Sequence, residues 1–198
     1  RERLGVDLRG GRAVEASWGA PSVRVTVTRP VLGIWDGHDA GAALIADGTL
    51  RAAISEERLA RMKRASGFPY LSVAAVLKEA GCAPSDVAGV AVAGAHGRSL
   101  HRCLDSLYRA GEPVRDPLSG LSTLVRVAET GVARAPGLRA VERRLSQTIL
   151  AGRFRTLGIL APVTLVDHHT AHAWTARLVG QGGARLITMD GYGDGLAA

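Results

Sequence analysis

The sequence has few residues of the kinds that mark several classes of protein. It holds two cysteines, Cys82 and Cys103, in 198 residues. They are too few for a disulfide framework and too far apart for a CxxC metal knuckle, so we expect both to be buried free thiols. No stretch approaches the ~18 to 20 uncharged apolar residues of a membrane-spanning helix, and no secretory signal is recognisable. The sequence therefore predicts a cytoplasmic protein without a membrane partner.

Lysine and the aromatic residues are also scarce. This matters for whether the net charge of +7 indicates nucleic-acid binding. The basic residues are spread along the whole chain, with no run longer than two, and aromatic residues make up only 4%. A nucleic-acid surface usually gathers its basic residues and adds aromatic rings for base stacking. We expect no nucleic-acid partner, whereas anionic small molecules fit the charge.

The chain divides into a short first segment and a longer patterned part. Residues 1–30 are rich in Arg and Gly, lack a clear period and end at Pro30, which predicts a leader or poorly ordered segment apart from a short strand at 23–27. The patterned part is expected to contain strands at 31–35, 86–94, 163–169 and 184–190, a hairpin around Asp47-Gly48, helices at 56–66, 70–81 and 170–180, and a helical insertion over 97–152. Ser55 is the expected N-cap of the first helix.

Polar clusters follow three of the expected strands. They read "DGHD" from residue 36, "DHH" from residue 167 and "DGYGDG" from residue 190. In an open α/β sheet, ligands bind beyond the carboxyl ends of the strands. The order of elements therefore predicts an α/β fold with one composite site at that edge.

Three of the six histidines lie within five positions, in "DHHTAHA". On a helix His168 and His172 are one turn apart on the same face, a spacing with which two imidazoles hold one transition-metal ion. Asp190, at the end of the next strand, would add a carboxylate. The alternative is a set of capping or core histidines with backbone partners. We favour the metal, with His169 as a supporting or substrate-binding residue.

The other two clusters each have a functional and a plain interpretation. Asp36 and His38 are two positions apart, so a carboxylate could orient an acceptor while the imidazole acts as a general base on a hydroxyl. A tight turn would explain Gly37 but not the histidine. The second cluster offers exposed backbone N–H groups that can approach a phosphate, or forms a simple turn. Its candidate nucleotide-binding residues are Gly191, Gly193 and Asp194.

The blocks "GIWDGHDAGAALIADGTLRAAISEERLARMKRASGFP", "DHHTAHA" and "TMDGYGDG" resemble, in this order, those of the O-carbamoyltransferases, a family of nodulation and antibiotic-tailoring enzymes. Residues 31–198 are similar to the N-terminal part of their Kae1-like domain, with a likeness through 97–150 that is only topological. The resemblance implies an actin-like, ribonuclease-H-like ATPase fold of the ASKHA type.

The resemblance also implies a reaction and its residues. A separate YrdC-like domain makes carbamoyl-adenylate from carbamoyl phosphate and ATP, and the Kae1-like domain transfers the carbamoyl group to a hydroxyl of a small-molecule acceptor. By position, iron would be held by His168, His172 and Asp190. Asp36 would bind the acceptor, His38 would lie beside its hydroxyl, and Lys63 would line the acceptor or nucleotide side.

Measured against that family, we expect the chain to be truncated at its C-terminus, without the YrdC-like domain and the second half of the Kae1-like domain. We therefore expect no transferase activity from this chain alone. Two alternatives stay open: a relative that adds threonylcarbamoyl to tRNA adenosine and shares the metal motif, and an inactive half-domain that only binds. The "DGHDA" and "EERLARMKR" blocks favour the small-molecule branch.

Overall fold

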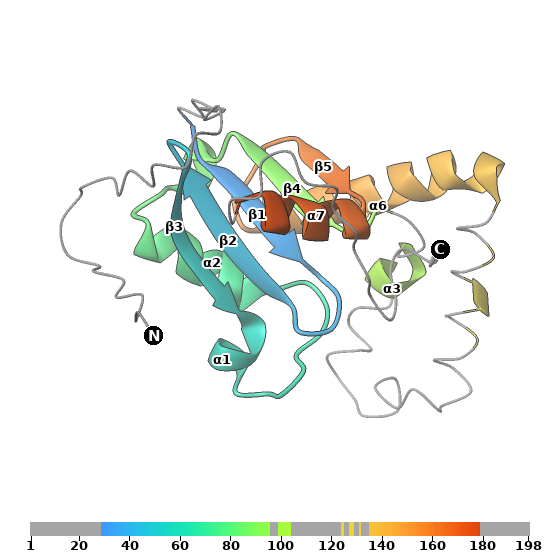
Figure 1. The fold of residues 1–198 in the computed structure, drawn as a ribbon, viewed down its shortest axis with the longest axis horizontal. Coiled ribbons are helices and arrows are strands. Elements are labelled where there is room, and N and C mark those ends of the chain that lie inside the picture. The colour runs from blue at the N-terminus through green and yellow to red at the C-terminus, as the bar shows by residue number, and fades with distance from the viewer. Residues whose placement is uncertain are drawn as a thin grey trace.

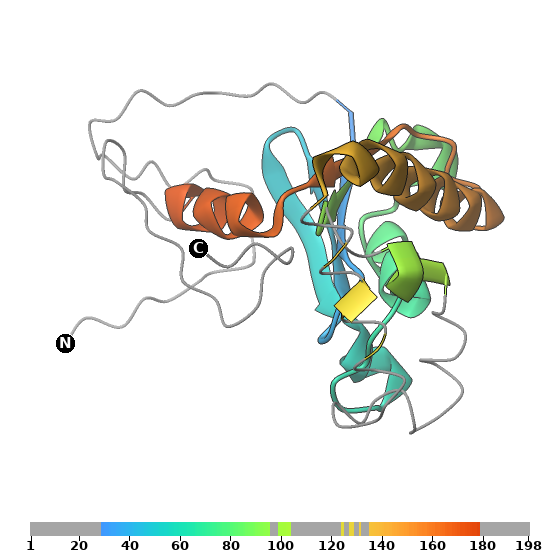
Figure 2. The same cartoon turned by 90° about the vertical axis from the view of Figure 1, so that its right-hand side faces the viewer.

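The computed structural model describes residues 29–95, 99–103, 124, 127–128, 131 and 135–178. The strands expected at 23–27 and 184–190 lie outside this part, and so do Asp190, Gly191, Gly193 and Asp194. Within the described part, a mixed sheet carries helices on both of its faces (Figures 1 and 2). The α/β class expected from the sequence is confirmed.

The sheet has five strands in the order β3-β2-β1-β4-β5. β1 (Val31–Trp35) pairs antiparallel with β2 (Gly41–Ala46), which pairs antiparallel with β3 (Thr49–Ser55). On its other side β1 runs parallel to β4 (Gly89–Ala93), and β4 runs parallel to β5 (Val163–Val166). The carboxyl ends of β1, β4 and β5 therefore meet at one edge of the sheet, as the polar clusters predicted.

The turn between β2 and β3 is the one that the sequence predicts. Asp47 and Gly48 both have positive φ, 53° and 70°. Two positive φ values match the right-handed twist of a two-residue hairpin, and Asp-Gly is among the pairs that tolerate them best. This local signal sets the pairing of Ala46 with Thr49 and of Ile45 with Leu50, beyond which the register shifts between Ile45 and Leu44.

One face of the sheet forms the hydrophobic core. α2 (Tyr70–Glu79) packs on β2 and β3, and α6 (Pro136–Thr156) packs beside β5. Alternate strand residues are buried beneath them, because side chains along a strand point to opposite faces. The residues at the centre of this core are Leu32, Leu44, Phe68, Val73, Val92, Leu150 and Phe154.

α7 (His168–Leu178) lies on the other side of the sheet from α2 and α6, as Figure 2 shows. It follows β5 after a single residue, Asp167. Because it starts at the carboxyl end of β5, its first turn is held at the same edge at which β1 ends. This arrangement brings the "DHH" cluster and the "DGHD" cluster to one end of the sheet.

The first helix differs from the expectation. α1 spans only Glu56–Ala60 and ends at Arg61, whose φ is 53°, and the Ser55 side chain makes no capping hydrogen bond. The prediction of a helix over 56–66 is therefore too long, because Arg61, with its left-handed backbone, ends the helix after little more than one turn. α2, in contrast, ends as expected, with Gly81 in the left-handed region at φ 60°.

Glu56, the first residue of α1, provides the N-terminal cap of the next helix. Its buried carboxylate accepts hydrogen bonds from the backbone N–H of Leu71 (3.1 Å) and from the N–H and hydroxyl of Ser72 (both 2.7 Å). The first N–H groups of a helix have no partner within the helix. A carboxylate satisfies them and also interacts favourably with the positive end of the helix dipole.

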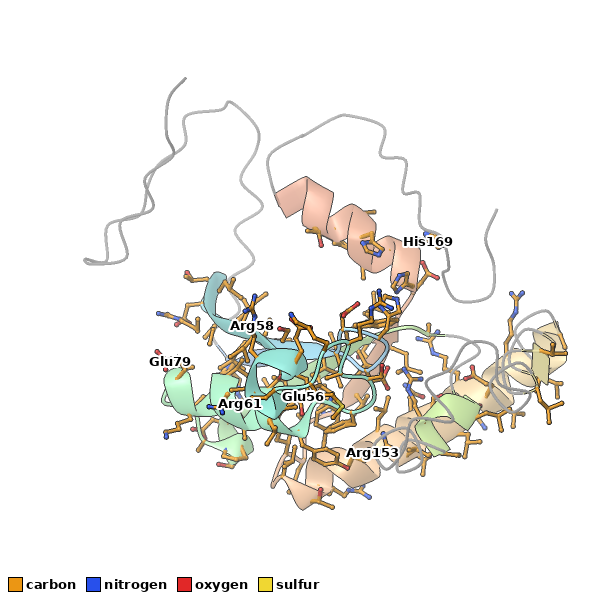
Figure 3. The ribbon with its side chains drawn as sticks, turned by 90° about the horizontal axis from the view of Figure 1, so that it is seen from below. Glu56, Arg58, Arg61, Glu79, Arg153 and His169 are labelled. Carbon is orange, nitrogen blue, oxygen red and sulfur yellow. The ribbon has the colours of Figure 1, made fainter. Side chains whose placement is uncertain are left out.

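Glu56→Ala is therefore expected to lower the free energy of unfolding by about 1–3 kcal/mol, since it leaves buried donors unsatisfied. Urea denaturation followed by circular dichroism measures this. Glu79→Ala, at the exposed C-terminal end of α2 (Figure 3), is the matched control, with an expected change within about 0.5 kcal/mol. Equal effects of the two substitutions would show that Glu56 does not cap α2.

The cysteines only partly match the expectation. Cys82 is half-buried, and burial, followed by the nearby Asp86 carboxylate, raises the pKa of its thiol. Cys103 is exposed, so the expectation that it is buried is wrong. Neighbouring helix positions are about 100° apart around the axis, so the fully buried Arg102 turns Cys103 outward. No helix among the described residues is long and apolar enough to cross a membrane.

Candidate metal centre

Asp167 is the N-cap residue of α7, so it determines where the helix begins and where the histidines lie. Its Oδ1 accepts hydrogen bonds from the backbone N–H of Thr170 (2.8 Å) and from the Thr170 hydroxyl (3.0 Å), which is the geometry of an N-cap. The helix therefore starts two residues before the expected 170. As a result both His168 and His172 lie on helical backbone, one turn apart on one face.

The two imidazoles converge. The Nε2 atoms of His168 and His172 are 3.1 Å apart, with ring centroids 4.6 Å apart and ring planes at 82°. Two nitrogens that each lie ~2.0–2.1 Å from one ion at tetrahedral to right angles are about 2.9–3.4 Å apart. The separation therefore fits joint ligation of one ion, and it equally fits an N–H···N hydrogen bond between the rings.

Two histidines alone do not make a complete site. Among the described residues, no group of three or more His, Cys, Asp or Glu side chains is placed to hold an ion. Asp190, the expected third ligand, lies outside those residues. His169 adjoins the pair, with its ring 5.9 Å from that of His168 at 83°, and Figure 3 shows it on the first turn of α7.

Trp35, whose role the sequence did not reveal, contacts His168 of the pair. It is the last residue of β1, and its ring centroid lies 4.8 Å from that of His168 at a tilt of 45°. Its indole Nε1 donates a hydrogen bond of 2.6 Å to the carbonyl of His38. The position of Trp35 at a strand end, directly before a polar cluster, is the signal that could have revealed it.

His38 lies in the turn after β1, with 75% of its side chain exposed. Its Nδ1 is 2.9 Å from Oδ2 of Asp39, whose φ of 53° is that of a tight turn. Its ring meets the Trp35 ring edge-on, with centroids 6.1 Å apart. The imidazole is therefore open to a solute and is linked to the histidine pair through one indole ring.

Asp36 is placed differently. Its side chain is 1% exposed and pairs with Arg102, which comes from α3 (Ser99–Cys103) on the α6 side of the sheet. Arg102 Nε lies 2.7 Å from Oδ2 and Nη2 lies 3.3 Å from Oδ1, while Nη2 also donates to the carbonyl of Gly94 at 2.9 Å. Asp36 thus stands on the core side of the turn, and the exposed His38 on the Trp35 side.

Residues of α6 hold α3, the helix that carries Arg102, in place. Arg153 of α6 donates from Nη2 to the carbonyl of Arg102, and its guanidinium lies over the Phe68 ring at 5.7 Å. Glu142 of the same helix accepts the backbone N–H of Ser99, at the start of α3, at 3.0 Å. The sequence could not single out Arg102, because it is one of many arginines and nothing in its local pattern marks it as buried.

Lys63, the remaining candidate, is exposed at 88% of its side chain and lies 3.4 Å from Oε1 of Glu57. It follows α1, which begins where the backbone N–H of Glu56 donates to the carbonyl of Ala40 at 2.7 Å. α1 thus starts directly beside the turn that carries His38. The described contact of Lys63 is with Glu57 and not with the histidine pair, so its role toward an acceptor or a nucleotide stays a prediction.

Comparison with known proteins shows to which family the chain belongs. The carbamoyltransferase N-terminus model matches residues 30–195. The nodulation protein NolNO of Sinorhizobium fredii is 28% identical over 158 residues, which is 79% of this chain and 20% of that protein. A protein of Synechocystis is 30% identical over 79% of this chain and 24% of its own length, and one of Methanocaldococcus jannaschii is 26% identical over 84% and 23%. The chain thus spans about a fifth to a quarter of the curated relatives it matches. It belongs to the carbamoyltransferase N-terminus family.

Proposed function

We propose that this chain carries the acceptor side and the metal-binding histidines of an O-carbamoyltransferase with an actin-like fold. The observation that most supports this proposal is the distance of 3.1 Å between His168 Nε2 and His172 Nε2. The His168 ring also contacts Trp35, the last residue of the strand that precedes His38. Membership of the family adds the carbamoyl group as the transferred unit. The acceptor would be a small molecule with a free hydroxyl.

In the proposed reaction, carbamoyl phosphate is hydrolysed to carbamate and phosphate. A carbamate oxygen then bonds to the α-phosphorus of ATP, the bond from that phosphorus to the β-phosphate oxygen breaks, and pyrophosphate leaves as carbamoyl-adenylate forms. The acceptor hydroxyl oxygen bonds to the carbamoyl carbon, the bond from that carbon to the adenylate phosphate oxygen breaks, and AMP leaves with the electron pair. The hydroxyl proton must go to a base. His38 suits this step because its ring is exposed, and because a neighbouring carboxylate at 2.9 Å can hold the imidazolium that forms.

The remaining residues would bind and orient. Asp36, held by Arg102, would fix the turn that presents His38, and Lys63 would attract an anionic group of the donor or acceptor. Gly191, Gly193 and Asp194 would approach the nucleotide phosphates with backbone N–H groups. His168 and His172, with Asp190, would hold a ferrous or similar ion, which supplies Lewis-acid polarisation of a bound oxygen.

His38→Ala in the complete gene product is expected to slow carbamoyl transfer by about 10²–10⁴-fold, the usual contribution of a general base. Donor formation should change little, since the imidazole would act only on the acceptor hydroxyl. Mass spectrometry of the acceptor reports transfer, and pyrophosphate release reports donor formation. The exposed Arg51 supplies a control, Arg51→Ala, that should leave both unchanged.

Two results would count against this assignment. Equal loss of both half-reactions in His38→Ala would show that His38 acts on structure rather than on the hydroxyl. Absence of carbamoylated product from the unchanged protein, across a panel of hydroxylated acceptors supplied with carbamoyl phosphate, ATP and ferrous iron, would contradict O-carbamoyl transfer itself. Modification of tRNA adenosine under the same conditions would favour the threonylcarbamoyl branch instead.

A further inference from the structure

Trp35 is in contact with both halves of the proposed site. One side of its ring packs against His168 at 4.8 Å, and its N–H is bonded to the carbonyl of His38 at 2.6 Å. Aromatic rings this close favour defined mutual orientations. The indole therefore restricts the rotation of the His168 imidazole while it holds the backbone of the turn after β1.

The turn is built around this ring. A Cβ atom added at Gly37 would lie 2.1 Å from Cζ2 and 2.4 Å from Cε2 of Trp35, so only glycine leaves room for the indole in its observed position. Gly37 has no positive φ among the described backbone angles, so space and not backbone freedom explains the glycine. The ring is thus held from the turn and from α7 at once.

We propose that Trp35 is a positioning residue for the histidine pair, so that metal binding by His168 and His172 and the conformation of the 36–39 turn are linked through one indole ring. This inference depends on the metal binding of the proposed function. Groups that orient a metal ligand from outside the coordination shell typically change metal affinity by about 10–100-fold. Coupling between two sites is reciprocal, so a change in the turn must alter metal affinity as well.

The test compares zinc affinities by isothermal titration calorimetry. Trp35→Ala is expected to weaken zinc binding by about 10–100-fold, and Trp35→Phe, which keeps a ring beside His168 but loses the N–H, by less. Gly37→Ala should also weaken binding, because it displaces the indole from the side of the turn. Trp174→Ala, on the same helix with 57% of the tryptophan exposed, is the matched control and should change affinity by less than about twofold.

The urea concentration at the midpoint of unfolding, measured without metal, distinguishes a loss of His168 positioning from a loss of fold stability. A positioning role predicts that zinc affinity falls in Trp35→Phe and Gly37→Ala even where the midpoint is unchanged, so the test survives if Trp35→Ala unfolds. Affinities within twofold of the unchanged protein in both of those variants would overturn the inference about Trp35. Absence of zinc binding in the unchanged protein would instead overturn the proposed metal site.

Discussion

Arg102→Met is expected to lower the free energy of unfolding by about 3–5 kcal/mol, the largest stability loss of any single substitution considered. The Asp36 carboxylate and the Arg102 guanidinium are both 1% exposed, and they meet through two nitrogens and two oxygens. Removal of the cation leaves a buried carboxylate without the two charge-assisted hydrogen bonds that Arg102 donates to it. Urea denaturation followed by circular dichroism measures the loss.

Arg51→Met supplies the matched control. Arg51 pairs with Asp47 at 3.1 Å, but both side chains are about half exposed, so we expect a change of only about 0–1 kcal/mol. The double variant Asp36→Leu/Arg102→Met should recover much of the stability, because two apolar side chains need no partner. A loss below about 1 kcal/mol in Arg102→Met would show that the pair does not stabilise the fold.

His168→Ala and His172→Ala are each expected to weaken binding of Co²⁺ or Zn²⁺ by more than about 100-fold, beyond the effect of residues that only support a ligand. The two Nε2 atoms approach to 3.1 Å, and removal of either ring leaves a single imidazole of the converging pair. Isothermal titration calorimetry measures the affinity. The absorption of bound Co²⁺ reports whether any remaining site has changed its coordination.

His38→Ala is the control here, because 75% of the His38 side chain is exposed and the hydrogen bond to Trp35 comes from the His38 backbone carbonyl, while the His38 ring meets the indole only edge-on at 6.1 Å. It should bind metal as tightly as the unchanged protein does. If both α7 variants retain full affinity, the short distance between the two rings is a hydrogen bond and the metal lies elsewhere. If only one variant loses affinity, the pair does not share one ion.

The parts of the fold that the sequence predicted well are those with a local signal. The Asp47-Gly48 turn, the end of α2 at Gly81 and the strand at 31–35 each depend on a few adjacent residues, and each is found in the structure. The spacing of His168 and His172 is of the same kind. Once a helix begins there, its geometry determines that the two rings lie on one face.

The parts that the sequence did not predict depend on residues far apart in the chain. Ser55 looked like a cap, but the carboxylate of Glu56 instead caps a helix that begins at Tyr70. Asp36 looked free to bind an acceptor, but its partner Arg102 arrives from a separate helix on the core side. Neither pairing leaves a periodic pattern in the sequence, so neither could be predicted without the structure.

The order of the strands also determines when the site can form. β1, β2 and β3 are joined by short turns and can pair within microseconds, whereas β4 and β5 add to the sheet only after long loops close, which is slower. During synthesis the hairpins are complete before Val163, the first residue of β5, has left the ribosome. The histidines follow β5 directly, so they reach Trp35 only after β5 has joined the four other described strands. A metal ion at this site would therefore bind after these five strands have paired and could not act as a nucleus for their pairing.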